Sequence, residues 1–277
     1  MKLPFEIDLS QKTAVVTAAG GVLMSEFAKA LAACGANVAL LGPHMSTLRP
    51  VADEIGEKAF PVEADCTDKK SLVHARELIR EKWGNADILV NGAGGNSPKA
   101  TTVNETMTAD IPADCKTFFD IGEDDFRSVL DLNISTAFIT TQVFAQDMLD
   151  RGGNIINISS MNAFRPLTKI PAYSAAKAGI SNLTQWLAVH FAPMGIRVNA
   201  IAPGFFVSRQ NHSLLFNPDG TPTKRSEKIL AATPMKRFGE VRDLIGTLLW
   251  LADDEASGFI TGTVIPVDGG FAAYSGV

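Results

Sequence analysis

The sequence predicts an α/β fold built on a doubly wound parallel sheet of about seven strands, with helices on both faces. Seven short runs rich in β-branched and aliphatic residues recur along the 277 residues, separated by longer stretches with helical periodicity. The runs are almost continuously apolar, which is typical of strands buried on both faces of a parallel sheet. Regular alternation of strand and helix indicates right-handed βαβ units.

The predicted strands occupy residues 13–17, 37–41, 59–63, 87–91, 154–158, 197–201 and 263–267. Between the third and fourth runs, Leu72, Ala75, Ile79 and Trp83 share one face of a helix whose other face is charged. Because no linker, repeat or composition break interrupts this alternation, we expect a single domain spanning residues 1–277.

Composition excludes several classes of protein. Apolar residues make up 46% of the chain, and 25 basic against 30 acidic residues give a net charge of −5, which disfavours a nucleic-acid-binding protein. No apolar run is long enough to span a membrane, and the first residues lack the apolar core of a secretory signal, so we expect a cytoplasmic protein. Cys34, Cys66 and Cys115 are far apart, and the four histidines lack ligand spacing, so we expect no metal site.

Two long segments, residues 96–119 and 205–238, depart from the alternation. The second contains the strong turn signal Asn217-Pro-Asp-Gly-Thr-Pro222. Both follow the carboxyl ends of predicted strands, where open α/β sheets bind their ligands. We interpret them as substrate-side loops, with an incidental surface role as the alternative.

A glycine-containing turn, Thr17-Ala-Ala-Gly-Gly-Val-Leu-Met24, follows the first strand and precedes a helix. Free N–H groups at such a helix start bind a dinucleotide pyrophosphate, but no Gly-x-Gly-x-x-Gly is present, so an ordinary turn is the alternative. The second strand ends in Gly42-Pro43-His44, without the acidic residue of an NAD site or the arginine of an NADP site. His44 either bonds a 2′-group or is a surface residue, and the cofactor preference stays open.

A candidate catalytic group lies further along the chain. Tyr173 and Lys177 are four residues apart and share a helix face, and Ser160 ends a strand thirteen residues before the tyrosine. An ammonium near a phenol stabilises the phenolate and lowers its pKa, which makes tyrosine a usable acid–base group. Taken alone, the Tyr–Lys pair also fits an ordinary surface helix.

In these residues the chain resembles the short-chain dehydrogenase/reductase family, whose fold is of the Rossmann type, and the resemblance covers essentially the whole length. Ser160, Tyr173 and Lys177 match its triad, and Asn133 matches its fourth catalytic residue. Asn91-Gly-Ala-Gly94, Asp65, Arg197-Val-Asn-Ala-Ile-Ala-Pro-Gly204 and Val267-Asp-Gly-Gly270 match further signatures.

The resemblance implies an NAD- or NADP-dependent oxidoreductase acting on CH–OH groups. Tyr173 would exchange a proton with the carbonyl or alcohol oxygen, Ser160 would steady that oxygen, and Asn133 would support a water-linked proton path. Lys177 would bind the nicotinamide ribose, and Asp65 would border the adenine. The implied cofactor-binding residues are Thr17, Gly20, Gly21, Val22, Leu23, His44, Asp65, Cys66, Asn91, Gly92, Ala93, Tyr173, Lys177, Pro203, Gly204, Phe206 and Ser208.

The chain departs from the family pattern in the cofactor turn, where Ala18, Val22 and Met24 replace three glycines. We expect Ala18 to be tolerated if its φ stays negative. The side chain of Met24 is expected to crowd the pyrophosphate, so cofactor binding should survive but be weak.

Residues 153–177 and 195–215, with the 96–119 insertion, resemble the family's sugar-acid branch, which includes D-mannonate oxidoreductases (fructuronate reductases). A carboxylate substrate would need a cation. The candidates for substrate contact are Lys99, Arg165, Lys169, Arg209, Asn211 and His212, each with a solvated surface role as the alternative. A reductase of 3-oxoacyl or secondary-alcohol substrates, and a cofactor-impaired binding or regulatory protein, remain open. The family also implies a homo-oligomer, commonly a tetramer, built on helices near 125–149 and 172–192.

Overall fold

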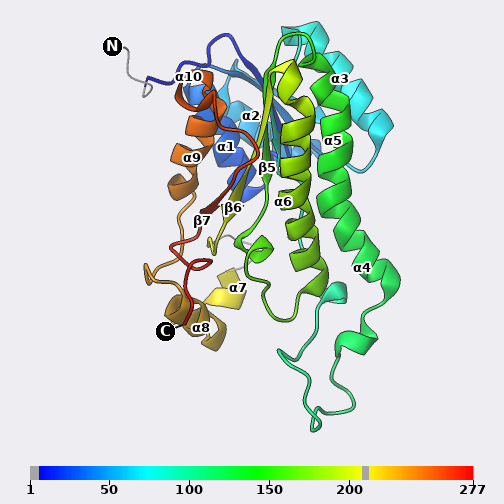
Figure 1. Ribbon diagram of the computed structural model, residues 1–277, viewed down its shortest axis with the longest axis vertical. Coiled ribbons are helices and arrows are strands. Elements are labelled where there is room, and N and C mark those ends of the chain that lie inside the picture. The colour runs from blue at the N-terminus through cyan, green and yellow to red at the C-terminus, as the bar shows by residue number, and fades with distance from the viewer. Residues whose placement is uncertain (1–5, 208–211, 277) are drawn as a thin grey trace.

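The fold is the predicted α/β architecture, seen in a computed structural model that describes residues 6–207 and 212–276 (Figure 1). Its seven strands are all parallel and form one sheet in the order β3-β2-β1-β4-β5-β6-β7. The order reverses between β1 and β4, the two strands at the centre of the sheet. In doubly wound sheets this switch point creates a crevice at the carboxyl ends of the strands.

The strands lie within two residues of their predicted bounds. They are β1 (Thr13–Thr17), β2 (Asn37–Gly42), β3 (Ala59–Glu63), β4 (Ile88–Asn91), β5 (Gly153–Ile158), β6 (Ile196–Pro203) and β7 (Val264–Val267). The α-helices are α1 (Val22–Ala33), α2 (Met45–Ile55), α3 (Lys69–Trp83), α4 (Glu123–Leu130), α5 (Thr136–Phe144), α6 (Pro171–Phe191), α7 (His212–Leu215), α8 (Lys224–Ala232), α9 (Arg242–Ala252) and α10 (Asp254–Ser257). A π-helical turn, η3 (Asp131–Ser135), joins α4 to α5, and short 3₁₀ turns occur at η1 (Pro98–Ala100), η2 (Phe118–Asp120), η4 (Ala145–Asp147), η5 (Met161–Ala163) and η6 (Ala192–Met194).

Helices cover both faces of the sheet and bury separate hydrophobic clusters. One face carries α1, α2 and α9, which contribute Phe27, Leu48 and Leu248 to its cluster. The other carries α3, α5 and α6, whose buried residues include Ile79 and Phe144. Among the described residues, no helix is both long enough and apolar enough to cross a membrane.

The two edge strands differ from the expectation that every strand is buried on both faces. β3 has one fully buried residue, Val62, and β7 has none, because each pairs with a neighbour on one side only. The interior strands β1 and β6 are buried along their whole length. Apolar continuity therefore identified the strands correctly but did not distinguish the edge from the centre.

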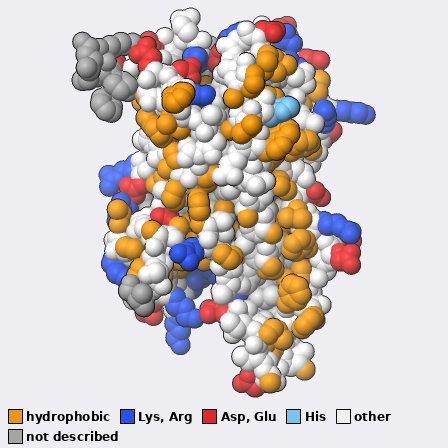
Figure 2. Space-filling view, in the orientation of Figure 1, with side chains coloured by type: hydrophobic (Ala, Val, Ile, Leu, Met, Phe, Trp, Pro, Cys, Tyr) orange, Lys and Arg blue, Asp and Glu red, His pale blue; other side chains and the backbone are white. Residues whose placement is uncertain are grey.

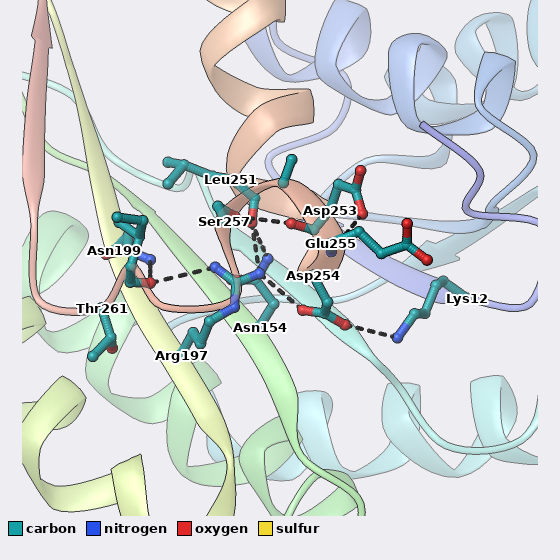
Figure 3. A network of polar contacts seen from close by, with 12 residues as sticks. Lys12, Asn154, Arg197, Asn199, Leu251, Asp253, Asp254, Glu255, Ser257 and Thr261 are labelled. Carbon is teal, nitrogen blue, oxygen red and sulfur yellow. Dashed lines mark hydrogen bonds and ion pairs between the residues drawn. The ribbon is translucent and has the colours of Figure 1, made fainter. Parts of the chain in front are cut away.

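The amino end of β6 is anchored by a buried arginine, at the end of the sheet opposite the crevice (Figure 3). Arg197 is 7% exposed and donates to the carbonyl of Leu251 at 2.9 Å and to the Asp254 carboxylate at 2.9 Å. Lys12 pairs with the other carboxylate oxygen of Asp254 at 3.1 Å. These contacts fix α9 and α10 against the amino end of β6. The part of β6 that lines the crevice lies at its other, carboxyl end.

Candidate active site

The β1–α1 turn presents free backbone N–H groups to the crevice. Gly21 caps α1 in an extended conformation without a side-chain hydrogen bond, and the first turn of α1 contains no acidic residue. The helix start is therefore uncapped and positive, as an anion site requires. This arrangement fits the pyrophosphate of a dinucleotide.

Ala18 does not keep the negative φ that we expected. Its φ is +53°, in the left-handed region that glycine adopts freely and that costs other residues about 1–2 kcal/mol. Its backbone carbonyl accepts from Gly21 N–H at 2.9 Å, which closes the turn. The turn thus retains a glycine-like path although the residue is alanine.

Met24 is largely withdrawn from the place where we expected it to crowd the pyrophosphate. The residue is 4% exposed and packs into the hydrophobic cluster beneath the turn, although it contributes to the cleft wall. A Cβ on Gly92 would overlap the Met24 sulfur, so Met24 occupies the space that Gly92 leaves. Gly20 likewise leaves no room for a side chain, since a Cβ there would lie 2.5 Å from the hydroxyl oxygen of Thr47 in α2.

Two residues predicted to bind the cofactor, Thr17 and Asn91, make hydrogen bonds that hold the walls of the cleft in place. The Thr17 hydroxyl accepts from the N–H groups of Gly92 at 2.8 Å and Ala93 at 3.1 Å, which ties β1 to the segment after β4. The Asn91 amide donates to Asn157 at 2.9 Å and to Thr141 at 3.0 Å inside the protein.

The predicted triad comes together at the carboxyl end of β5 and on α6. Ser160 caps η5 by accepting from Asn162 N–H at 3.2 Å and also forms a hydrogen bond with Tyr173. Lys177 is 4% exposed and its ammonium donates to the Ile158 carbonyl at 2.9 Å. The same ammonium lies 5.5 Å from the centre of the Tyr173 ring.

Burial sets the pKa values of this group. It lowers the pKa of Lys177 to about 8, because the buried ammonium has lost much of its hydration. Burial also raises the pKa of Tyr173 above its ordinary value, against a lowering by the hydrogen bond with Ser160. We expected Lys177 to lower the phenol pKa, and here burial dominates instead.

Asn133 is fully buried in the π-helical turn and braces the segment after β4. Its side-chain oxygen accepts from Gly95 N–H at 3.1 Å, while its amide donates to the carbonyls of Gly95 at 2.8 Å and Val129 at 2.7 Å. A Cβ on Gly94 would lie 2.5 Å from that oxygen and 3.1 Å from the Lys177 ammonium. The described contacts therefore assign Asn133 a positioning role.

These residues surround a cleft of about 590 Å³. Of the residues predicted for catalysis or cofactor binding, those lining it are Gly20, Gly21, Val22, Leu23, Gly92, Ser160, Tyr173, Lys177, Pro203, Gly204 and Phe206. The lining residues that sequence reasoning did not assign to cofactor binding are Ala18, Met24, Gly42, Pro43, Thr47, Gly94, Gly95, Ile158, Ser159 and Phe205. Gly94 ends the matched motif Asn91-Gly-Ala-Gly94 and Gly95 follows it, so both could have been found from that motif.

The other predicted cofactor residues, Thr17, His44, Asp65, Cys66, Asn91 and Ala93, do not line the cleft. Exposed Asp65 accepts from Thr67, and these hydrogen bonds lower its pKa. Cys66 is buried, which raises the pKa of its thiol to about 11. His44 is the exposed N-cap residue of α2. Ser208 lies outside the described residues.

The substrate candidates are spread over several places. The Arg165 guanidinium donates to the Ala272 carbonyl at 3.1 Å, and neither Arg165 nor Lys99 lines the cleft. Lys169 lines a second hollow of about 520 Å³ between residues 102–107 and α6. His212 begins α7, whereas Arg209 and Asn211 lie outside the described residues. In residues 6–207 and 212–276 there is no group of three or more His, Cys, Asp or Glu side chains that could hold a metal ion.

Comparison with known proteins agrees with this geometry. Residues 23–272 match the family model described as Enoyl-(Acyl carrier protein) reductase. A crystal structure of a Haemophilus influenzae protein with bound NAD, named provisionally as a D-mannonate oxidoreductase, is 52% identical, covers all of both chains and superposes with a TM-score of 0.95. An uncharacterized oxidoreductase of Bacillus subtilis is 52% identical over 99% of this chain and 100% of its own. The 2-dehydro-3-deoxy-D-gluconate 5-dehydrogenase of Bacillus subtilis is 34% identical over 95% of each chain.

Proposed function

The chain belongs to the short-chain dehydrogenase/reductase family, and on that premise we propose that it interconverts a sugar acid and its keto form, with D-mannonate and D-fructuronate as the leading pair. It is an NAD-dependent oxidoreductase acting on alcohol and keto groups. The observation that carries the proposed chemistry is the convergence of Ser160, Tyr173 and Lys177 on the cleft beside the uncapped start of α1.

We assign cofactor binding to the residues that line this cleft. The N–H groups at the start of α1 would hold the pyrophosphate, and Gly92 and Gly94 would allow the dinucleotide to approach the backbone. Lys177, which lines the same cleft, would bond a ribose hydroxyl. When bound, the nicotinamide accepts or supplies the hydride, and the protein orients it.

Tyr173 is the proposed proton donor and acceptor. Because burial raises its pKa, the phenol is protonated in the free protein and ready to protonate a keto oxygen during reduction. In alcohol oxidation, the Tyr173 oxygen must first lose that proton and then takes the proton of the substrate hydroxyl. Ser160 steadies the reacting oxygen through its own hydroxyl, and the Lys177 charge stabilises a developing phenolate.

The sugar-acid assignment is supported by the provisional D-mannonate name of one relative and by the gluconate-derived substrate named for another. The family model, described as Enoyl-(Acyl carrier protein) reductase, favours an acyl substrate as the second candidate. Polar residues in the 96–119 and 205–238 segments favour a hydroxylated substrate over an acyl chain. The relative with bound NAD argues against a cofactor-impaired regulatory protein.

A substrate panel tests this proposal. The enzyme is assayed with NAD⁺ and NADP⁺ against D-mannonate, D-gluconate, D-altronate and simple secondary alcohols, and with NADH against a 3-oxoacyl thioester. We expect oxidation of D-mannonate with NAD⁺ at a higher kcat/KM than any other substrate tested. Turnover of the 3-oxoacyl thioester alone would replace the sugar-acid proposal with the acyl one.

We also propose that the protein forms a homo-oligomer, which a measurement of its mass in solution by light scattering would test. Apolar side chains gather over the helices α4 to α6 (Figure 2). Exposed apolar residues of these elements include Leu132 of η3, Phe138 of α5, and Trp186 and Val189 of α6, all more than 40% exposed. Isolated exposed apolar residues are ordinary, but several large ones on neighbouring helices favour an interface. A monomeric mass at micromolar concentration would contradict the proposal.

A further inference from the structure

The two substrate-side segments, far apart in the sequence, are joined by an ion pair. Lys228 of α8 donates to both carboxylate oxygens of Glu105, at 3.0 and 3.1 Å. The residues are 123 positions apart. In the part of the chain that the structure describes, this is the one ion pair between residues 96–119 and 205–238.

Each partner is carried by a segment that continues from the cleft wall. Residues 96–119 follow Gly95, whose backbone lines the cleft and bonds Asn133. Residues 205–238 begin with Phe205 and Phe206, which line the same cleft, and the Phe205 carbonyl accepts from the Gly239 N–H after the end of the segment at 2.9 Å. A constraint between the two segments therefore connects two stretches of chain that both adjoin the cleft.

Both ends of the pair rest on local structure. The first segment is fixed near Glu105 by the bond from Thr102 N–H to the Lys169 carbonyl at 2.9 Å, where Lys169 has a φ of +73°. In the second segment, buried Ser226 of α8 donates to the Leu215 carbonyl of α7 at 2.5 Å, and after α8 the Met235 N–H donates to the Gly269 carbonyl, outside the segment, at 3.1 Å. The ion pair therefore joins two stretches of chain that are each held by other hydrogen bonds.

The electrostatics also favour this contact. The pKa of Glu105 lies below its ordinary value, first because of the hydrogen bond from Lys228 and then because of its charge. The charges of Lys169 and Arg225 act on Glu105 in the same direction. Lys228 and Arg225 of α8 and Lys169 of the loop before α6 thus all favour the ionised Glu105 carboxylate.

We propose that Glu105 and Lys228 form a brace that positions α8 against residues 101–117 and so sets substrate affinity. The inference rests on the proposed function only in that the substrate enters between these segments. Both side chains are partly exposed, Glu105 at 46% and Lys228 at 69%, so the ion pair is weak. A weak contact suits a substrate entrance, because it can break while substrate enters and product leaves. Neither residue lines the cleft that holds the triad, although Glu105 lines the second hollow, so we assign both a positioning role.

The test uses Glu105→Gln, Lys228→Met and the double variant E105Q/K228M. Hydrogen exchange of the α8 amides, residues 224–232, is measured with NAD⁺ present, and kinetics are measured with D-mannonate. We expect each single variant to accelerate α8 exchange and to raise KM about two- to fivefold, since exposed ion pairs have effects of this size. We expect kcat and the Kd for NADH to stay within about twofold of wild type. The double variant should resemble the single variants rather than add their effects, because either single change already removes the ion pair.

Matched controls are Glu123→Gln and Arg127→Met, which remove an exposed pair within α4 and should change neither property. Unchanged α8 exchange in both single variants would overturn the brace, as would a double variant whose effect equals the sum of the two single effects. Faster α8 exchange without a change in KM would overturn its role in substrate affinity. If wild type does not oxidise D-mannonate, the proposed substrate fails while hydrogen exchange still decides whether the brace exists, and KM is then measured with the best substrate of the panel.

Discussion

Replacing Lys177 by methionine should stabilise the folded protein while removing its activity. Lys177 is buried, and its pKa falls from 10.5 to about 8. At about 1.4 kcal/mol per pKa unit, keeping the buried ammonium charged costs about 3 kcal/mol below pH 8. Methionine has a similar shape and no charge, but it loses the hydrogen bond to the Ile158 carbonyl, which is worth about 1 kcal/mol. We therefore expect a net gain of about 2 kcal/mol near neutral pH.

The gain should depend on pH in a defined direction. The pKa of Lys177 is lower in the folded than in the unfolded chain, so the unfolded chain binds more protons between about pH 8 and 10.5. Wild-type stability from this group therefore rises with pH through that window. The advantage of Lys177→Met should be largest below pH 8 and should shrink by about 2 kcal/mol by about pH 9.5.

Urea unfolding of wild type and Lys177→Met, at fixed protomer concentration and several pH values, measures this difference. Lys70→Met, at an exposed lysine of α3, controls for the loss of one positive charge. Activity of Lys177→Met should fall at least about 100-fold because the tyrosine loses its cation. A variant that is less stable than wild type at every pH, with a difference independent of pH, would refute the reasoning.

Three further changes test the cleft. Ala18→Gly should raise the free energy of unfolding by about 0.5 kcal/mol, because relief of the left-handed backbone exceeds the flexibility gained by the unfolded chain; a loss of about 1 kcal/mol in urea unfolding would contradict this. Thr17→Val should lower stability by about 2–3 kcal/mol and weaken NADH binding about tenfold in a fluorescence titration, since the Gly92 and Ala93 N–H groups lose their acceptor, whereas Thr17→Ser should retain both properties. Arg165→Met should leave KM for D-mannonate within about twofold, because Arg165 does not line the cleft and its Nε–H donates to the Ala272 carbonyl; a KM raised about tenfold would restore Arg165 as a substrate ligand.

Most of the fold was predictable because hydrophobic periodicity reports burial directly. The runs at 13–17 and 59–63 became β1 and β3 with the same bounds. The apolar pattern could not show which strands lie at the edges of the sheet, because the apolar content of a run does not encode strand pairing. The strand order shows that β3 and β7 are the edge strands, which is why they are less buried than the others.

The site was predictable where a short motif fixes local geometry. Tyr173 and Lys177 reach the cleft because four residues bring a helix back to the same face. Thr17 and Asn91 also follow a motif, but side-chain contacts with neighbouring segments turn them toward structural roles. The conformation of Ala18 and the pair of Glu105 with Lys228 depend on tertiary contacts that residue spacing does not show.

The central claim is that Tyr173 transfers the proton within an intact NAD site. It is tested most directly by comparing wild type and Tyr173→Phe in NADH binding and in D-mannonate oxidation by NAD⁺. We predict that the Tyr173→Phe variant binds NADH with a Kd within about threefold of wild type, while its kcat falls at least about 100-fold, since general acid–base catalysis contributes about 10²–10⁴-fold. Unimpaired oxidation of D-mannonate by Tyr173→Phe would contradict the account.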